Sequence, residues 1–206
     1  MPVFRNNADQ QEYEDSELSN RGVQYSVVGL CGSLRKDSIN MKLLRAAQSL
    51  APGPINVTIF HLDDIPLYNQ DVQDEHGFPA EVEELCQLIE SAAAVLIVTP
   101  EYNYSIPGVL KNTIDWVSRW PTTPFDEKLV AILGASPGRL GTARCQYHLR
   151  QCFVFLNSQV INRPEVMLGN AYALFDESGN IIDEKTRELV AKLMRELYKK
   201  IESAAN

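Results

Sequence analysis

Apolar runs alternate with helical patterns along most of the chain. From Tyr25 onward, short runs rich in β-branched residues are each followed by a segment whose apolar residues recur every three or four positions. One run, residues 94–99 (AVLIVT), is apolar throughout, which is typical of a strand covered on both faces. Strands that alternate with helices in this way indicate a parallel sheet with crossover helices. The pattern therefore predicts an α/β domain over residues 25–206.

Five strands and five helices are expected within this domain. The predicted strands are residues 25–31, 55–62, 94–99, 129–134 and 159–161, the last of which resumes at 166–168. The apolar stripes of the predicted helices begin at Leu43, Val82, Leu110, Cys145 and Val190. These elements form an open doubly wound sheet, in which a ligand binds beyond the carboxyl ends of the strands, where the strand order reverses. The loops expected to meet there are residues 32–40, 100–107 and 134–142.

The first 24 residues have a different character from the rest. They are polar, show no periodicity and carry five acids against two arginines, a net charge of 2 − 5 = −3. The charged residues are Asp9, Glu12, Glu14, Asp15 and Glu17, with Arg5 and Arg21. This composition predicts a disordered acidic arm over residues 1–24; the alternative is a segment that docks on a partner subunit.

Charge and composition exclude several classes of function. The net charge of −8 argues against a nucleic-acid partner or an anionic membrane surface. No apolar run approaches the roughly 18–20 residues that span a bilayer, and the first residues lack the apolar centre of a signal peptide. The four cysteines form no C-x-x-C pair, and the three histidines are too far apart for a metal site. We therefore expect a cytoplasmic protein without a structural metal.

The loop GSLRKDSIN, residues 32–40, has the groups that bind a phosphate. The N-terminus of a helix offers unpaired backbone N–H groups and the positive end of the helix dipole. To these the loop adds the hydroxyls of Ser33 and Ser38, the guanidinium of Arg35 and the amide of Asn40, which suit a nearly doubly charged phosphate monoester. The G-x-G-x-x-G fingerprint of a dinucleotide site is missing. The alternative is an ordinary turn in which Ser38 caps the helix.

The loop PEYNYSIPG, residues 100–108, has groups that suit a flat heterocycle. Tyr102 and Tyr104 offer planar faces, Asn103 offers an amide, and two prolines stiffen the segment. Such groups match a ring system that bears carbonyls and ring N–H groups. The alternative is a pair of half-buried surface tyrosines without a ligand.

The loop GASPGRLGTAR, residues 134–144, is rich in glycine. Its three glycines allow the backbone to approach a ligand closely, and Ser136 and Thr142 offer hydroxyls. A glycine-rich loop after a strand is common, so this segment alone indicates little.

Together, the three loops resemble those of the NAD(P)H-dependent FMN reductase family, most closely its bacterial quinone- and chromate-reducing branch. The resemblance covers about residues 25–200 and is carried by GSLR with Ser38 and Asn40, by PEYNYSIPG leading to LKNTIDW, by the S-x-G-x-x-G pattern of residues 136–141, and by ARCQYHLRQ. It implies a flavodoxin-like doubly wound five-stranded parallel sheet with helices on both faces, and FMN as cofactor. NADPH or NADH would be the electron donor.

The resemblance also implies which residues bind the cofactor. The FMN phosphate would be surrounded by Ser33, Arg35, Ser38, Ile39 and Asn40. The isoalloxazine would be bordered by Pro100, Glu101, Tyr102, Asn103 and Tyr104, with Ser136 and Gly138 closing the site. No side chain is expected to act as a catalytic acid or base, because the flavin carries the chemistry and the protein supplies placement and electrostatics.

The implied function is that of an enzyme with small-molecule acceptors. Hydride would pass from NAD(P)H to FMN and then, from the same face, to quinones, flavins or oxidised metal ions such as chromate. One alternative is a non-enzymatic electron carrier of flavodoxin type, although such carriers usually lack an arginine in the phosphate loop. The other is an NAD-binding Rossmann enzyme, whose ribose-binding acid should lie about 20 residues past the glycines. Asp63 lies 31 residues past Gly32, which disfavours it.

A homodimer or homotetramer is expected. The core stripe of the predicted helix around residues 143–156 leaves Arg144, Tyr147, His148 and Gln151 on another face. Arg and Tyr are enriched in interface cores, and members of the resembling family usually form dimers or tetramers. The alternative is a solvated polar face.

Overall fold

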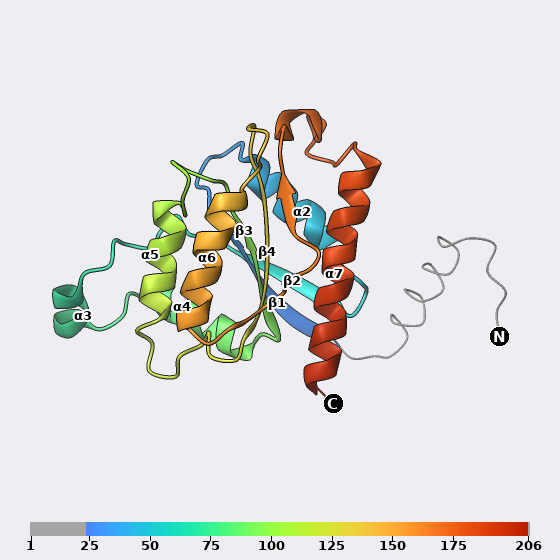
Figure 1. Cartoon of the computed structure of the whole chain (residues 1–206). Coiled ribbons are helices and arrows are strands. Elements are labelled where there is room, and N and C mark those ends of the chain that lie inside the picture. Colours follow the sequence, from blue (N-terminus) through green and yellow to red (C-terminus); the bar gives the residue numbers. More distant parts are fainter. Residues whose placement is uncertain (1–23, 206) are drawn as a thin grey trace.

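The computed structural model describes residues 24–205, and its sheet has the strand order β2-β1-β3-β4-β5 (Figure 1). All strand pairs are parallel. The strands are β1 (Tyr25–Cys31), β2 (Ile55–Phe60), β3 (Ala94–Val98), β4 (Leu129–Ala135), β5 (Gln159–Val160) and β6 (Val166–Leu168). This is the order of flavodoxin-like sheets, and it differs from the 3-2-1-4-5-6 order of dinucleotide-binding Rossmann folds. The predicted flavodoxin-like fold is therefore confirmed.

The edge strand beside β4 is formed in two parts. β5 pairs with the start of β4, where Leu129 faces Gln159, and β6 pairs with its end, where Leu133 faces Val166. The interrupted fifth strand predicted from the sequence is thus present. The predicted arm lies outside the described residues except for Gln24, whose side-chain amide donates to the carbonyl oxygen of Gly53 (3.4 Å).

Helices cover both faces of the sheet. Two of them, α2 (Ile39–Ser49) and α7 (Glu184–Ala205), share one apolar core with the sheet, and three others, α4 (Ala80–Ser91), α5 (Gly108–Val117) and α6 (Ala143–Phe155), share the other (Figure 1). Every residue of β3 is buried between the two cores, as its uninterrupted apolar sequence predicts. Within residues 24–205 no helix is both long and apolar enough to cross a membrane.

One short helix, α3 (Gln70–His76), was not predicted. Its N-terminus is capped by the Asn69 side chain, which accepts from the Asp71 N–H (3.0 Å), and it ends at Gly77, whose φ is 78°. None of its residues is buried. A helix without a buried face has no apolar periodicity, so the sequence pattern indicated only a loop there.

Candidate functional site

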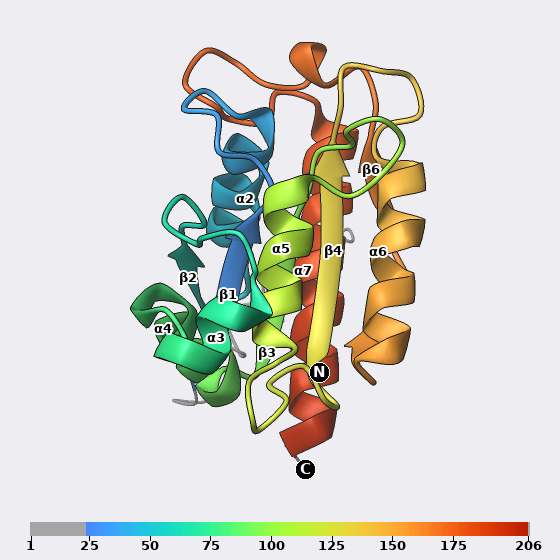
Figure 2. The same cartoon turned by 90° about the vertical axis from the view of Figure 1, so that its left-hand side faces the viewer.

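The three loops predicted to meet do meet at the carboxyl end of the sheet (Figure 2). They enclose a cavity of about 100 Å³, called the strand-end cavity below. Its lining residues are Ser33, Arg35, Ser38, Ile39, Asn40, Pro100, Glu101, Tyr102, Ala135, Ser136, Pro137 and Tyr172. Nine of the twelve predicted cofactor-binding residues are in this lining; Asn103, Tyr104 and Gly138 are not.

The first loop presents hydroxyls and a cation at the start of α2. Ser38 caps the helix, because its hydroxyl oxygen accepts from the Met41 N–H (3.4 Å), and the Ser33 hydroxyl accepts from the Arg35 N–H (3.4 Å). Both serines are almost fully buried, whereas Arg35 is exposed and has no ion-pair or hydrogen-bond partner for its guanidinium among residues 24–205. The first N–H groups of α2 have no partner within the helix. Such a set of donors suits an anion.

The side-chain amide of Asn40 is engaged within the chain, and its contact with the FMN phosphate stays a prediction. Its side-chain NH₂ donates to the carbonyl oxygen of Ala135 (2.9 Å), and its side-chain oxygen accepts from the Ala135 N–H (2.9 Å). Both residues are buried. The amide is therefore occupied in joining the start of α2 to the end of β4, and it holds the first and third loops together.

The second loop makes a tight turn at its tip. The backbone N–H and carbonyl groups of Tyr102 and Ser105 pair in both directions (3.1 and 2.9 Å), and Asn103 and Tyr104 have positive φ angles of 50° and 66°. A left-handed backbone is unfavourable for tyrosine. The guanidinium of Arg144 lies over the Tyr104 ring, 3.6 Å from its centroid, a cation–π contact that helps to keep the ring in this position.

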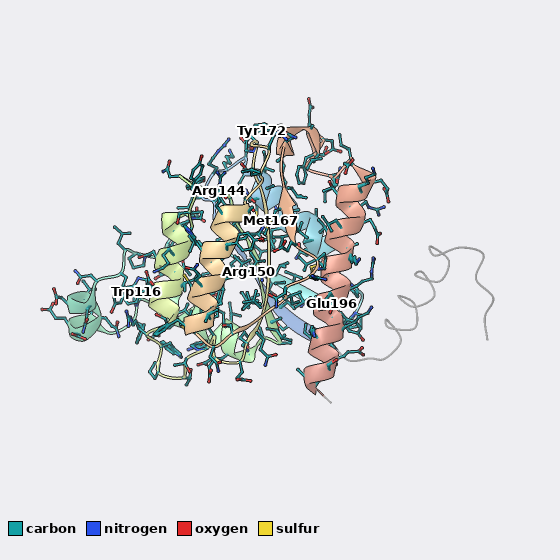
Figure 3. All side chains as sticks on the ribbon, viewed as in Figure 1. Trp116, Arg144, Arg150, Met167, Tyr172 and Glu196 are labelled. Carbon is teal, nitrogen blue, oxygen red and sulfur yellow. The ribbon has the colours of Figure 1, made fainter. Side chains whose placement is uncertain are left out.

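Glu101 joins this second loop to α6. Its carboxylate accepts from the Arg144 guanidinium (2.7 Å) and from the Cys145 N–H (3.0 Å), and its side chain is only 5% exposed. A carboxylate at a helix N-terminus is further stabilised by the helix dipole. Arg144 thus contacts both Glu101 and Tyr104, and Figure 3 places it near the end of the molecule where the loops meet.

The third loop is held against β3 and β6. A side chain at Gly134 would overlap the Thr99 carbonyl oxygen and the Thr142 hydroxyl, so the close approach there requires glycine. Ser136 donates its N–H to the Leu168 carbonyl (2.9 Å) and accepts from the Ala171 N–H (3.1 Å). These bonds place Ser136 at the rim of the strand-end cavity.

Tyr172 lines the cavity and was missed by the sequence interpretation (Figure 3). It lies on the short 3₁₀ helix Ala171–Ala173, just after β6, and is 67% exposed. The signal was present in the sequence, because residues that follow any parallel strand reach the same edge of the sheet.

Cysteines near the loops are held as neutral thiols. Burial raises the pKa of Cys145 to about 11, and burial also raises the pKa of Cys31 above its ordinary value. At neutral pH both remain protonated, and a protonated thiol is a poor nucleophile. Neither thiol is therefore expected to act as a nucleophile at this site.

Comparison with known proteins agrees with the geometry. The sequence model of the NADPH-dependent FMN reductase family matches residues 25–173. The chain is 50% identical over 171 residues to the NAD(P)H-dependent FMN reductase PA1204 of Pseudomonas aeruginosa, covering 83% of the chain and 92% of the relative. It is 51% identical over 162 residues to a quinone reductase of Escherichia coli, covering 78% and 86%.

A solved structure is also similar. It is FerB of Paracoccus denitrificans, described as a flavoenzyme NAD(P)H:(acceptor) oxidoreductase, which superimposes with a TM-score of 0.80 at 34% identity over 87% of this chain and 98% of FerB.

Proposed function

The chain belongs to the NADPH-dependent FMN reductase family, and we propose from this premise that it binds FMN at the strand-end cavity and uses NAD(P)H to reduce quinones. The protein is an oxidoreductase, and FMN and NAD(P)H are its cofactor and electron donor. The observation that carries the proposal is the set of unpaired donors at the start of α2, within the same lining as the aromatic second loop.

The residues present fit the cofactor. Buried hydroxyls of Ser33 and Ser38, the free guanidinium of Arg35 and the N-terminus of α2 match a phosphate monoester. Tyr102 and Tyr172 add aromatic faces at the same cavity. When bound, FMN supplies the transfer of a hydride equivalent from NAD(P)H to an acceptor. The chain's own contribution is to hold the phosphate, to orient the ring and to fix the second loop through Glu101.

Quinones are the acceptor class that we propose first, because relatives about half identical to this chain are named quinone reductases. A further relative, 42% identical over 164 residues, is a 2-hydroxy-1,4-benzoquinone reductase from a Burkholderia species. Free flavins and chromate remain predictions from the sequence alone. The proposal also favours an enzyme over an electron carrier, which needs a protein partner.

Steady-state kinetics test this proposal. If donor and acceptor occupy one site in turn, initial rates with NADPH and benzoquinone, and no added protein partner, should give parallel double-reciprocal lines, the sign of a ping-pong cycle. Intersecting lines would show that both substrates bind together and would refute a shared site. No NADPH oxidation at all would favour the electron-carrier alternative.

We further propose a homo-oligomer in which the outer face of α6 contacts a second copy. Tyr147 and Gln151 are exposed on this face, as predicted, and Val154 and Phe155 extend it with side chains that are 80% and 88% exposed. Beside Phe155 lies a cavity of about 660 Å³. Exposed apolar groups gathered on one helix mark a contact surface. Arg144, also predicted on this face, pairs with Glu101 within the chain, and its contact with a partner stays a prediction.

Light scattering at micromolar concentration tests this surface. Wild-type protein should be a dimer or tetramer, and Phe155→Glu should shift it toward monomer, because a charge replaces an apolar contact. Leu67→Glu is the matched control, since Leu67 is 85% exposed and lies on a different segment. A wild-type monomer would contradict the oligomer, and an unchanged Phe155→Glu assembly would remove this face from it.

A further inference from the structure

Another cavity, larger than the strand-end cavity, lies on the outer side of α2. It has a volume of about 500 Å³, within the range of small-molecule sites. We call it the basic groove; α2, the segment 178–181 and the start of α7 line it. Figure 2 shows the loop before α2 and the segment before α7 side by side at the top of the molecule, where Lys42 Nζ donates to the Glu177 carbonyl oxygen (3.4 Å). Ser38 lines both cavities, so the two are neighbours.

The charge of the basic groove is opposite to that of the chain. Its lining has four cations, Lys36, Lys42, Arg45 and Arg187, and one acid, Asp37, a net charge of 4 − 1 = +3 in a chain of −8. Among residues 24–205, Arg187 is the one cation of this lining that has an ion-pair partner. Arg187 is 3.9 Å from Glu184, an exposed pair of the weak kind. Asp176, two residues before the segment 178–181, remains charged while its carboxylate accepts from the N–H and the side-chain amide of Asn180 (2.8 and 2.9 Å).

Two of the cations are free to bind a ligand. Neither Lys36 nor Arg45 has an ion-pair partner among residues 24–205, and both side chains are exposed. Lys42 and Arg45 are three residues apart on α2, so they project from the same face of the helix. An arginine that is not paired with a carboxylate can bind a phosphate with two parallel hydrogen bonds.

The rest of the lining suits a nucleoside. Apolar atoms come from Met41, Leu50 and Ile181, which can pack against a flat base. Ser178 and Asn180 provide a hydroxyl and an amide at the other wall. A cationic wall beside an apolar one is the combination that a nucleotide requires, with its phosphate on the first and its base on the second.

We propose that the basic groove binds the phosphate monoester and base of an adenosine nucleotide, at a site separate from the FMN phosphate. Two sources share this chemistry. One is the 2′-phosphate half of NADPH, which would make the groove the determinant of NADPH over NADH and rests on the proposed function. The other is a nucleotide that binds without donating electrons.

Titration calorimetry on the full FMN-loaded chain tests the site without turnover. The probes are adenosine 2′,5′-bisphosphate, adenosine 5′-monophosphate and inorganic phosphate, and the variants are Arg45→Ala and Lys42→Ala. Arg45→Ala should weaken bisphosphate binding about 10- to 100-fold, the loss expected for one charge-assisted contact. Lys192→Ala, which removes an exposed lysine of α7 outside the groove, is the charge-matched control and should have almost no effect.

Kinetics then distinguish the two sources. If KM for NADPH rises about 10-fold or more in Arg45→Ala while KM for NADH and kcat are unchanged, the groove holds the 2′-phosphate of the donor. If Arg45→Ala loses bisphosphate binding but its KM values for NADPH and NADH are unchanged, the ligand is a separate nucleotide. Bisphosphate binding that is absent, equal in all variants, or no tighter than inorganic phosphate would overturn the proposal. If the purified protein contains no FMN and takes none up, yet binds the bisphosphate in a way that Arg45→Ala weakens, the proposed function is refuted and the groove remains a nucleotide site.

Discussion

Replacing Arg35 with alanine is expected to weaken FMN binding by about 2–3 kcal/mol, roughly 30- to 150-fold, and to leave riboflavin binding nearly unchanged. Arg35 lines the strand-end cavity beside two buried serine hydroxyls, and no group among residues 24–205 pairs with its guanidinium. Its free charge is therefore available to a phosphate dianion. Riboflavin lacks the phosphate, so it should not respond.

Fluorescence titration of the apoprotein with FMN and with riboflavin measures this difference. Arg139→Ala is the matched control, because Arg139 is an exposed arginine of the third loop that does not line the cavity. It should change neither affinity by more than a few tenths of a kcal/mol. If Arg35→Ala weakens FMN and riboflavin binding equally, Arg35 contacts the isoalloxazine or stabilises the fold. The prediction that it binds the phosphate would then be wrong.

The second large effect is expected at Asn40. Asn40→Ala removes both hydrogen bonds to Ala135 and leaves a buried N–H and a buried carbonyl unpaired. Each unpaired group costs about 1–3 kcal/mol, so the free energy of unfolding should fall by about 2–6 kcal/mol. FMN affinity should fall as well, since the same two bonds hold the first loop to the third.

Urea unfolding followed by circular dichroism measures the first effect, and flavin fluorescence the second. Asn112→Ala is a close control: the Asn112 side chain also bonds backbone groups in both directions, with the Tyr68 N–H and the Pro66 carbonyl, but at a half-exposed site that is not part of the cavity lining. We expect Asn112→Ala to lower the free energy of unfolding by about 1 kcal/mol or less and to leave FMN affinity unchanged. Equal effects of the two substitutions would mean that Asn40 does not organise the site.

The fold was readable from the sequence because its signals are local. An apolar run such as β3 and an apolar stripe such as that of α2 each depend on neighbours a few positions away. The cap at Ser38 is equally local, since its partner is three residues on. For the same reason α3 was not predicted: none of its residues is buried, so its sequence shows no apolar periodicity.

The site was readable only in part because its organisation is not local. The sequence pattern predicted that the three loops meet at one edge of the sheet. It could not show that the Asn40 side chain is hydrogen-bonded to Ala135, 95 positions away. Likewise Glu101 is bound to Arg144, 43 positions along the chain. Residue type predicted the Asn40 amide as a donor to the ligand, and the family resemblance placed Glu101 beside the ring. Pairing within the chain decides which of them remain free, and Arg35 is the clearest of those.

The most direct measurement of the central claim is the visible absorbance spectrum of the purified wild-type protein, recorded without oxygen before and after addition of NADPH. We predict one tightly bound FMN per chain, released on denaturation and identified by chromatography, and bleaching of its absorbance by NADPH followed by recovery on addition of benzoquinone. A protein that shows no flavin absorbance and takes up no FMN in a titration would contradict the account.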